Sequence, residues 1–566
     1  MARVKPIDAA PAAGIIREMN SPLETFQPRA ALAALDRLVA AARARLADAV
    51  AGQGGAPDTA KLEARQRQAH GLAWLAAHAR ALAALQDWAE ALAAAGRFGE
   101  TERLQHAIAF SEYLSRAAYG LPMGQSEIAR PHDLGIAAEA AAFAADPAVA
   151  ALIAAGAAPE ARAALAARLA DGDFGDPGDG EEGALMRGSF ARFAAERVAP
   201  HAQAWHRDDA LIPDSVLAAL AELGLFGLTI PAAQGGLGLG KRALCIVTEA
   251  LSAAHLGVGS LGTRAEIAGE LIAGAGTADQ KARFLPGIAS GAILPTAVFT
   301  EPDVGSDLAH LKTRARRVDG GYLVTGAKTW ITHGARSDLM TLLVRTDPKE
   351  PGHRGLSMLL AEKPRGTPDE PFPAKGMRGG EIRTLGYRGL KEYDIAFEDF
   401  PVPAENLLGG EEGAGFRQLM ATFESARIQT AARAVGVAQG ALAAAVEYAT
   451  TRRQFGKPLI AFPRVSDKLA LIAAELQTVR QLTMAACDAK DAGRRSDVEA
   501  GMAKLLAARL AWAAADDGLQ IHGGIGYAEE TPISRWLVDA RILNIFEGAG
   551  EIQAQVIARG LLSPRN

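Results

Sequence analysis

The sequence predicts a mainly α-helical protein with a central β domain and an additional helical domain at its N-terminus. Three observations lead to this fold class. Ala- and Leu-rich stretches in both halves carry apolar residues at helical spacing, and short β-type runs cluster between them. The chain has 566 residues, more than one ordinary domain of roughly 50 to 250 residues holds.

Five regions are expected from these patterns. They are an N-terminal helical extension (1–170), a linker (171–183), a helical domain (184–291), a β domain (292–406) and a C-terminal helical bundle (407–566).

The extension contains two apolar stripes at helical spacing, one including Leu32, Leu35 and Leu46 and a longer one from Leu72 to Leu92. Such stripes are typical of core-facing helices, so the region is predicted to be a helical bundle. It shows no catalytic constellation. The following 171–183 segment is rich in Gly and acidic residues, and it cannot bury enough apolar surface to fold alone, which predicts a linker.

The β domain is predicted from short runs split by Gly, Asp and Pro turns, a spacing that suits a small antiparallel barrel or sandwich. The expected strands lie at 322–325, 329–332, 340–344, 356–360 and 393–397. No GxGxxG follows a strand and no GxxxxGK[ST] occurs, so nucleotide binding through a Rossmann turn or a P-loop has no support.

Composition excludes several classes of protein. The formal net charge of −5 provides no general basic field, so we expect no nucleic-acid partner. Two cysteines, Cys245 and Cys487, make neither a disulfide framework nor a CxxC zinc site, which indicates a cytoplasmic protein without a bound metal. Residues 1–6 lack a following apolar signal segment, and acids and prolines interrupt the Ala-rich run 134–170, so no membrane span is expected.

Near the C-terminus, the segment 545–553 (IFEGAGEIQ) places a carboxylate, Glu547, between Phe546 and Gly548. Poor solvation there would raise the pKa of Glu547 and make it a stronger base, and the glycines would let the backbone approach a ligand. The alternative is a helix start, at which Glu547 lies beside the positive end of the helix.

Two segments could bind a flat polar ligand. In the turn 299–307 (FTEPDVGSD), Thr300 and Ser306 offer hydroxyls to a heteroaromatic ring or a phosphate, although the same residues could simply cap the turn. In 326–333 (GAKTWITH), Trp330 and Thr332 are expected on one face of a strand, where an aromatic surface and a hydroxyl would meet the same ligand.

Two further segments lie at helix ends. The cations of 452–459 (RRQFGKPL) favour the helix dipole but could equally hold a pyrophosphate. The glycine-rich segment 520–527 (QIHGGIGY) is a break between two expected helices.

Taken in the order of the chain, the five segments resemble the acyl-CoA dehydrogenase family, whose motifs are TEPxxGSD, GxKxWIT, RxxFG, QxxGGxGY and EGxxxIQ. The resemblance covers roughly residues 184–566 and implies the acyl-CoA dehydrogenase fold with FAD as cofactor. It implies that Thr300, Ser306, Trp330 and Thr332 contact the isoalloxazine ring. It further implies that four residues hold the FAD diphosphate and adenosine across a subunit interface: Arg452, Phe455, Gln520 and Gly524.

By the same resemblance Glu547 is the catalytic base. Some family members place the base on an earlier helix, directly before an arginine, and here that position is Ala426 before Arg427. Alanine takes no proton, which leaves Glu547. The family usually has Thr where this chain has Ala549, which removes one hydrogen bond to FAD, about 0.5 to 1.5 kcal/mol.

The activity implied is α,β-dehydrogenation of an acyl-CoA thioester, with the α proton taken by Glu547 and the β hydrogen passed to flavin N5 as hydride. An electron-transferring flavoprotein is the implied electron acceptor. The extension and the segment 383–393 (RTLGYRGLKEY) are similar to the family's (2S)-methylsuccinyl-CoA dehydrogenase group of the ethylmalonyl-CoA pathway, which implies mesaconyl-CoA as product.

Substrate-binding candidates are Ser306, Arg264, Glu424 and Arg427. Arg264 lies where the family lines the acyl end of its pocket and is the candidate partner of a substrate carboxylate, although a surface arginine at a helix start is an equal alternative. Glu424 matches an acidic contact to CoA, or is a solvated helix residue.

Four other activities stay open: a generic short-chain acyl-CoA dehydrogenase, a glutaryl-type enzyme that releases carbon dioxide, an acyl-CoA oxidase, and a non-catalytic flavoprotein or assembly factor. The helical extension suggests a homodimer rather than a tetramer, because it could cover the face through which dimers pair.

Overall fold

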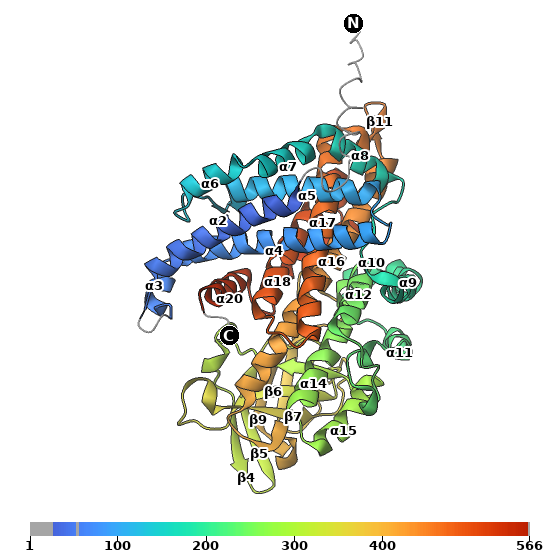
Figure 1. The fold of residues 1–566 in the computed structure, drawn as a ribbon. Coiled ribbons are helices and arrows are strands. Elements are labelled where there is room, and N and C mark those ends of the chain that lie inside the picture. The colour runs from blue at the N-terminus through green and yellow to red at the C-terminus, as the bar shows by residue number, and fades with distance from the viewer. Residues whose placement is uncertain (1–26, 53–55, 564–566) are drawn as a thin grey trace, which may run out of the picture.

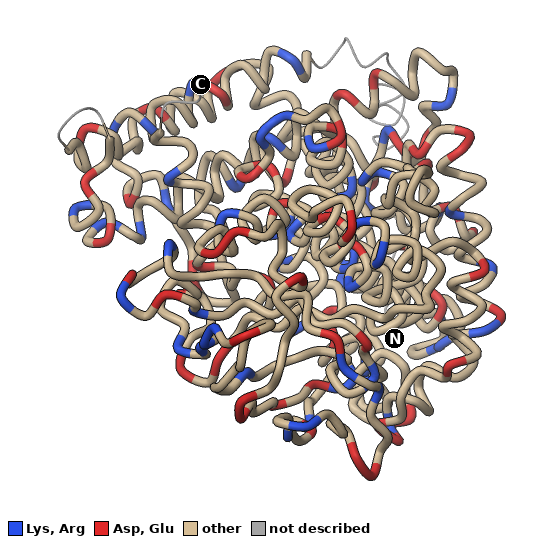
Figure 2. The backbone as a smooth tube through the Cα atoms, turned by 90° about the horizontal axis from the view of Figure 1, so that it is seen from below, with Lys and Arg blue, Asp and Glu red and all other residues tan. Residues whose placement is uncertain are grey.

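The computed structural model describes residues 27–52 and 56–563, and residues 1–6, for which no signal segment was expected, lie outside them. Figure 1 shows the helical extension at one end, long C-terminal helices through the middle and the β domain at the other end. One apolar core runs through the extension and both helical regions of the remaining chain, whereas the β domain has a second core of its own. Acidic and basic residues are interspersed along the chain (Figure 2).

The extension is a helical bundle, as predicted. Its helices are α2 (Pro28–Ala49), α3 (Thr59–Glu63), α4 (Gln66–Ala94), α5 (Glu100–Tyr119), α6 (Ala137–Ala144), α7 (Pro147–Ala157) and α8 (Pro159–Ala170), with a small ribbon of β1 (Leu121–Pro122) and β2 (Ile128–Ala129) after α5. Helix α4 is buried on several sides because it packs against α2 and α5 of the extension and against α17 (Pro463–Asp491) and α20 (Gly550–Leu562) of the C-terminal region. The extension is thus joined to the rest of the chain by a packed interface.

No single helix among the described residues is long and apolar enough to cross a membrane. The pair α6 and α7, bent by 69°, reaches that length and composition only when the two helices are taken together.

The segment after α8 is tied down on both sides. The indole of Trp88 and the side-chain amide of Gln477 both donate to the carbonyl oxygen of Asp176, each at 3.1 Å. Trp88 belongs to the extension and Gln477 to α17, so this glycine-rich stretch is hydrogen-bonded to both. Helix α9 begins at Gly180, inside the predicted linker.

A second helical region follows this glycine-rich stretch. It contains α9 (Gly180–Arg197), α10 (Ala199–Arg207), α11 (Asp214–Glu222), α12 (Lys241–Ser252), α13 (Leu256–Gly259), α14 (Leu261–Ala275) and α15 (Ala278–Ala289). Helices α12 and α14 pack along α16 (Gly415–Thr451), and α14 carries Arg264 into the interior.

The β domain is a seven-stranded sheet of β3 (Pro295–Val298), β4 (Arg314–Val318), β5 (Gly321–Lys328), β6 (Leu339–Arg345), β7 (Leu356–Glu362), β8 (Met377–Ile382) and β9 (Glu392–Pro403). The strand order is β3-β6-β4-β5-β9-β8, and β7 pairs with β6. Most pairs are antiparallel as expected, but β3 runs parallel to β6, and β4 has one parallel bridge to β6. The sheet is therefore mixed rather than purely antiparallel.

The expected strand at 329–332 is wrong. Strand β5 ends at Lys328, and Trp330 follows in the left-handed region with φ 58°. That conformation breaks the alternation of a strand, so Trp330 is 55% exposed while Thr332 is buried. The two side chains do not share one face.

The C-terminal region consists of α16 (Gly415–Thr451), α17 (Pro463–Asp491), α18 (Asp497–His522), α19 (Pro532–Ile542) and α20 (Gly550–Leu562), with a ribbon of β10 (Arg453–Gln454) and β11 (Lys457–Pro458). Helix α16 has 37 residues and spans about 55 Å at 1.5 Å per residue. It reaches from the β domain to the extension (Figure 1).

Candidate active site

Glu547 lies in the turn between α19 and α20, three residues before α20 begins. The turn is left-handed, with φ 52° at Glu547 and 91° at Gly548. A Cβ on Gly548 would come within 2.1 Å of Nε2 of Gln553. The positive φ favours glycine here, and any larger side chain would also have to displace the amide of Gln553, which folds back against the turn.

The carboxylate of Glu547 is held by two arginines and a hydroxyl. Arg264 of α14 donates to Oε1 at 3.0 Å, and Arg433 of α16 donates to Oε2 at 2.6 Å. Thr430, one turn before Arg433, also hydrogen-bonds Oε2. The guanidinium of Arg433 lies 4.9 Å from the ring centre of Phe546, the neighbour of Glu547. Three elements far apart in the sequence thus converge on one carboxylate.

The expected rise in the pKa of Glu547 is wrong for this structure. Burial acts to raise it, but the charges of Arg433 and Arg264 and the hydrogen bonds from Thr430 and Arg433 outweigh burial and hold the pKa below its ordinary value. Solvation by the sequence neighbours does not decide the pKa. As arranged here, Glu547 is an ionised carboxylate in a double ion pair.

A second acidic group borders the same cluster. Burial raises the pKa of Glu392 to about 7, against a hydrogen bond from Thr332 and the positive charge of Arg264. Arg264 Nε and the hydroxyl of Tyr387 are buried without a hydrogen-bond partner among the described residues. Two donors therefore remain to bind an acceptor that the chain itself does not supply.

Ala426, the rival position for a base, lies beside this cluster. It is buried one turn before Thr430, whose hydroxyl is 2.9 Å from the carbonyl oxygen of Ala426 and also contacts Glu547. Because Ala426 and Thr430 are four residues apart on α16, they lie on one face of that helix, and Thr430 joins this face to Glu547.

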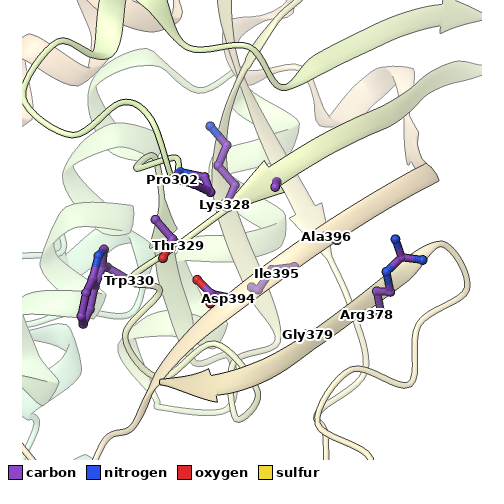
Figure 3. A pocket seen from close by; sticks show the side chains of 10 residues that line it. Pro302, Lys328, Thr329, Trp330, Arg378, Gly379, Asp394, Ile395 and Ala396 are labelled. Carbon is purple, nitrogen blue, oxygen red and sulfur yellow. The ribbon is translucent and has the colours of Figure 1, made fainter. Parts of the chain in front are cut away.

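A cavity of about 560 Å³ opens on the β domain (Figure 3). Trp330 lies at one end of its lining and Arg378 of β8 at the other. Buried Lys328 ties the lining to the 299–307 turn, because its amine donates to the carbonyl of Phe299 at 2.9 Å and to Glu301 at 3.0 Å. An exposed indole beside an open cavity suits a flat aromatic ligand.

The turn residues predicted to contact such a ligand lie near this region. Thr300 is half-buried and its carbonyl accepts from the amide of Thr329, which lines the cavity, whereas Ser306 is exposed.

The other four predicted cofactor residues lie at the far end of α16. Arg452 caps that helix, and Phe455 stands 92% exposed at the tip of the β10–β11 ribbon. Gln520 and Gly524 are exposed at the end of α18, which is joined to the end of α16 by stacking of Tyr448 on His522 at 4.3 Å.

This group lies far from Glu547 of the same chain. Thr430, beside Glu547, and Arg452 are 22 residues apart along α16, roughly 33 Å along its axis.

Glu424 and Arg427 belong to the first part of α16. Glu424 accepts from Lys490 at 3.3 Å and from the Ser496 hydroxyl at 3.0 Å, so it is paired within the chain. Arg427 is half-buried, and burial lowers its pKa against the charges of Asp497 and Glu424.

Sequence reasoning missed Arg433 and Thr430. The available signal was a polar pair within an otherwise apolar helix stripe, since Arg433 is completely buried on α16. A buried arginine requires a partner, which would have directed attention to a carboxylate. Among the described residues, no group of three His, Cys, Asp or Glu side chains could hold a metal ion.

Comparison with known proteins identifies the family. Models of the N-terminal, middle and C-terminal domains of acyl-CoA dehydrogenase match residues 180–292, 296–400 and 413–562. The chain belongs to the acyl-CoA dehydrogenase family. It is an acyl-CoA dehydrogenase by these domains, an oxidoreductase that uses a flavin cofactor, and the exposed Trp330 beside the cavity fits that cofactor.

Individual relatives differ in how much of the chain they match. The (2S)-methylsuccinyl-CoA dehydrogenase of Cereibacter sphaeroides is 56% identical over 532 residues, 94% of this chain and 97% of the relative. The solved butyryl-CoA dehydrogenase of Megasphaera elsdenii is 31% identical with a TM-score of 0.63 and covers 67% of this chain and 98% of its own. A chain solved in work on the electron-transferring flavoprotein of Acidaminococcus fermentans is 31% identical, TM-score 0.63, and covers 68% and 98%. The match to the first extends into the N-terminal extension, which the other two leave uncovered.

Proposed function

We propose that this acyl-CoA dehydrogenase oxidises (2S)-methylsuccinyl-CoA to mesaconyl-CoA with Glu547 as base. The observation that carries the proposal is the convergence of Arg264 and Arg433 on Glu547, at 3.0 and 2.6 Å. These two buried guanidinium groups carry two positive charges, against the full negative charge of Glu547 and the partial charge of Glu392, which its pKa of about 7 leaves about half ionised near neutral pH. A buried excess of positive charge is unfavourable, and a carboxylate on the substrate would neutralise it.

The position of the arginines suits a short dicarboxylic acyl group. In a methylsuccinyl thioester the free carboxylate is attached to the β carbon, so it lies close to the α hydrogen that the base removes. A cation that binds this carboxylate must therefore lie next to the base, as Arg264 and Arg433 do. An uncharged butyryl group would leave the excess charge in place.

Substrate binding would also activate the base. While both arginines pair with Glu547, its pKa is held low and it is a weak base. A substrate carboxylate that takes over one or both guanidinium groups weakens this hold and raises the pKa of Glu547 as the α carbon arrives. Arg264 Nε and the Tyr387 hydroxyl, which have no hydrogen-bond partner within the described part of the chain, are further donors for the substrate.

We assign the cofactor as FAD. Thr300, Ser306, Trp330 and Thr332 would hold the ring end, and Arg452, Phe455, Gln520 and Gly524 of a second chain the diphosphate and adenosine. The separation of roughly 33 Å along α16 supports a site shared between two chains. FAD supplies the electron-pair acceptor for the β hydrogen. Trp330 would shield the ring from oxygen, which favours an electron-transferring flavoprotein as acceptor.

We further propose a cytoplasmic homodimer. Both cysteines are buried and unpaired, as suits a reducing compartment. Helices α4, α5 and α8 cover α17, so this face of the bundle is unavailable for pairing of dimers. Light scattering tests the assignment, and a tetrameric mass would refute it.

The substrate is tested by anaerobic flavin bleaching with a panel of thioesters, namely both methylsuccinyl-CoA enantiomers and succinyl-, glutaryl- and butyryl-CoA. We expect fastest bleaching with the 2S enantiomer and no release of carbon dioxide. Faster bleaching with butyryl-CoA, or carbon dioxide from glutaryl-CoA at a comparable rate, would identify a generic short-chain or a glutaryl-type enzyme instead.

A further inference from the structure

Lys504 is a completely buried lysine that contacts the turn of Glu547 from a different helix. It lies on α18, and its amine donates to the carbonyl oxygen of Gly548 at 2.6 Å. Gly548 directly follows Glu547. A buried ammonium is unfavourable unless it is hydrogen-bonded and faces negative charge, so its place beside this turn requires a reason.

The turn itself needs external support. Glu547 is a non-glycine residue in the left-handed region, a conformation that costs about 1 kcal/mol or more. Gln553 Nε2 lies 3.1 Å from the carbonyl oxygen of Gly548 and 3.3 Å from that of Glu547. Lys504 and Gln553 thus hold the same carbonyl, one with a charged donor and the other with a neutral one.

Charged groups from three elements act on Lys504. They are Glu547 in the turn, Arg433 and Arg427 on α16, and Glu551 on α20. Burial lowers the pKa of Lys504 to about 7, although Glu547 acts to raise it. Below pH 7 Lys504 is therefore mostly protonated, and its positive charge adds to those of the two arginines that hold the carboxylate of Glu547.

We propose that Lys504 is a positioning residue for the base: it fixes the left-handed turn through the carbonyl of Gly548 and its positive charge keeps the carboxylate of Glu547 ionised. It acts through the turn and does not bind the substrate. This inference rests on the proposed function, in which Glu547 removes the α proton.

Three variants separate the anchor from the charge. Lys504→Met removes both, Lys504→Gln keeps an amide donor without the charge, and Gln553→Met removes the neutral donor from the same carbonyl. All are assayed as flavin-loaded enzyme with (2S)-methylsuccinyl-CoA from about pH 3.5 to 9, a range that reaches below the ordinary pKa of a glutamate, and flavin content and thermal unfolding are measured alongside. Glu547→Gln is included as a reference.

For Lys504→Met we expect kcat to fall about tenfold or more, with KM changed much less, because a displaced base slows the chemical step. The acid limb of kcat/KM should move to higher pH by roughly half a unit or more, since loss of a nearby cation raises the pKa of Glu547. Lys504→Gln should recover part of kcat but keep the shifted limb. Gln553→Met should lower kcat without moving the limb.

Two results would overturn the inference. One is a flavin-loaded Lys504→Met enzyme with unchanged kcat and an unmoved acid limb. The other is loss of flavin and of the folded state in both Lys504 variants, which would make Lys504 a general folding residue. If Glu547→Gln is inactive while the Lys504 variants are normal, this inference alone fails, whereas an active Glu547→Gln enzyme refutes the proposed function.

Discussion

Replacing Arg433 by methionine removes one of the two cations at Glu547 while it keeps a long apolar side chain on α16. Arg433 has three polar partners besides Glu547 at 2.6 Å: the Thr430 hydroxyl at 2.8 Å, the Ser260 hydroxyl at 3.3 Å and the carbonyl of Gln429 at 3.4 Å. The change therefore removes a charge and its hydrogen bonds from a buried site without a large cavity.

The size of the effect depends on the substrate. A hydrogen bond to a charged group contributes about 1.5 to 3 kcal/mol, which corresponds to a fall of about tenfold to 150-fold in kcat/KM for methylsuccinyl-CoA. Butyryl-CoA has no carboxylate for Arg433 to bind, so its kcat/KM should change by less than about threefold. With one cation gone the pKa of Glu547 rises, and the acid limb for both substrates should move to higher pH.

The assay is steady-state kinetics with both thioesters and an artificial electron acceptor. Arg480→Met is the matched control, because Arg480 is also a buried helical arginine but donates to the carboxylate of Glu249, at 2.8 Å, and not to Glu547. The control should lose stability but keep the ratio of the two activities. Equal losses for methylsuccinyl-CoA and butyryl-CoA in Arg433→Met would refute the assignment of Arg433 to the substrate carboxylate.

Three further changes test the base, its turn and the extension. Glu547→Gln should lower kcat by about 100-fold to 10,000-fold with flavin still bound, and an active enzyme would exclude Glu547 as base. Gly548→Ala should lower the thermal midpoint more than Gly410→Ala does. Both glycines have positive φ, but only at Gly548 would the new Cβ come within 2.1 Å of another group, the side-chain amide of Gln553. Equal shifts in the midpoint would count against the turn geometry. Glu475→Gln should destabilise the protein at pH 7 by about 3 to 5 kcal/mol, since it breaks a buried ion pair with Arg116 of the extension. Burial acts to raise the pKa of Glu475, but the charges of Arg116 and Arg509 outweigh it and hold the pKa below the ordinary 4.5. The difference in unfolding free energy between the variant and the unmodified protein should therefore be complete above pH 4.5 and vanish as pH falls through the lower pKa of the folded state. A difference that persists in acid would contradict the ion pair.

Helix positions followed from the sequence because each apolar stripe records which face of a helix is buried. The stripe from Leu72 to Leu92 lies in α4, and the predicted C-terminal bundle, residues 407–566, contains α16 to α20. Trp330 was placed wrongly because a run of β-formers reads as a strand, whereas its φ of 58° depends on contacts of neighbouring residues, such as the paired backbone of Ile331 and Tyr393.

The sequence by itself determined the order of the domains, the family and Glu547 as the candidate base, because motifs and periodicity are local properties of the chain. Only the tertiary structure decided the state of that base. Arg433 and Arg264 lie 114 and 283 residues away from Glu547, and their charges reverse the pKa shift that its neighbours suggest. Electrostatic effects depend on distance in space, and packing of α14 and α16 against the turn sets that distance.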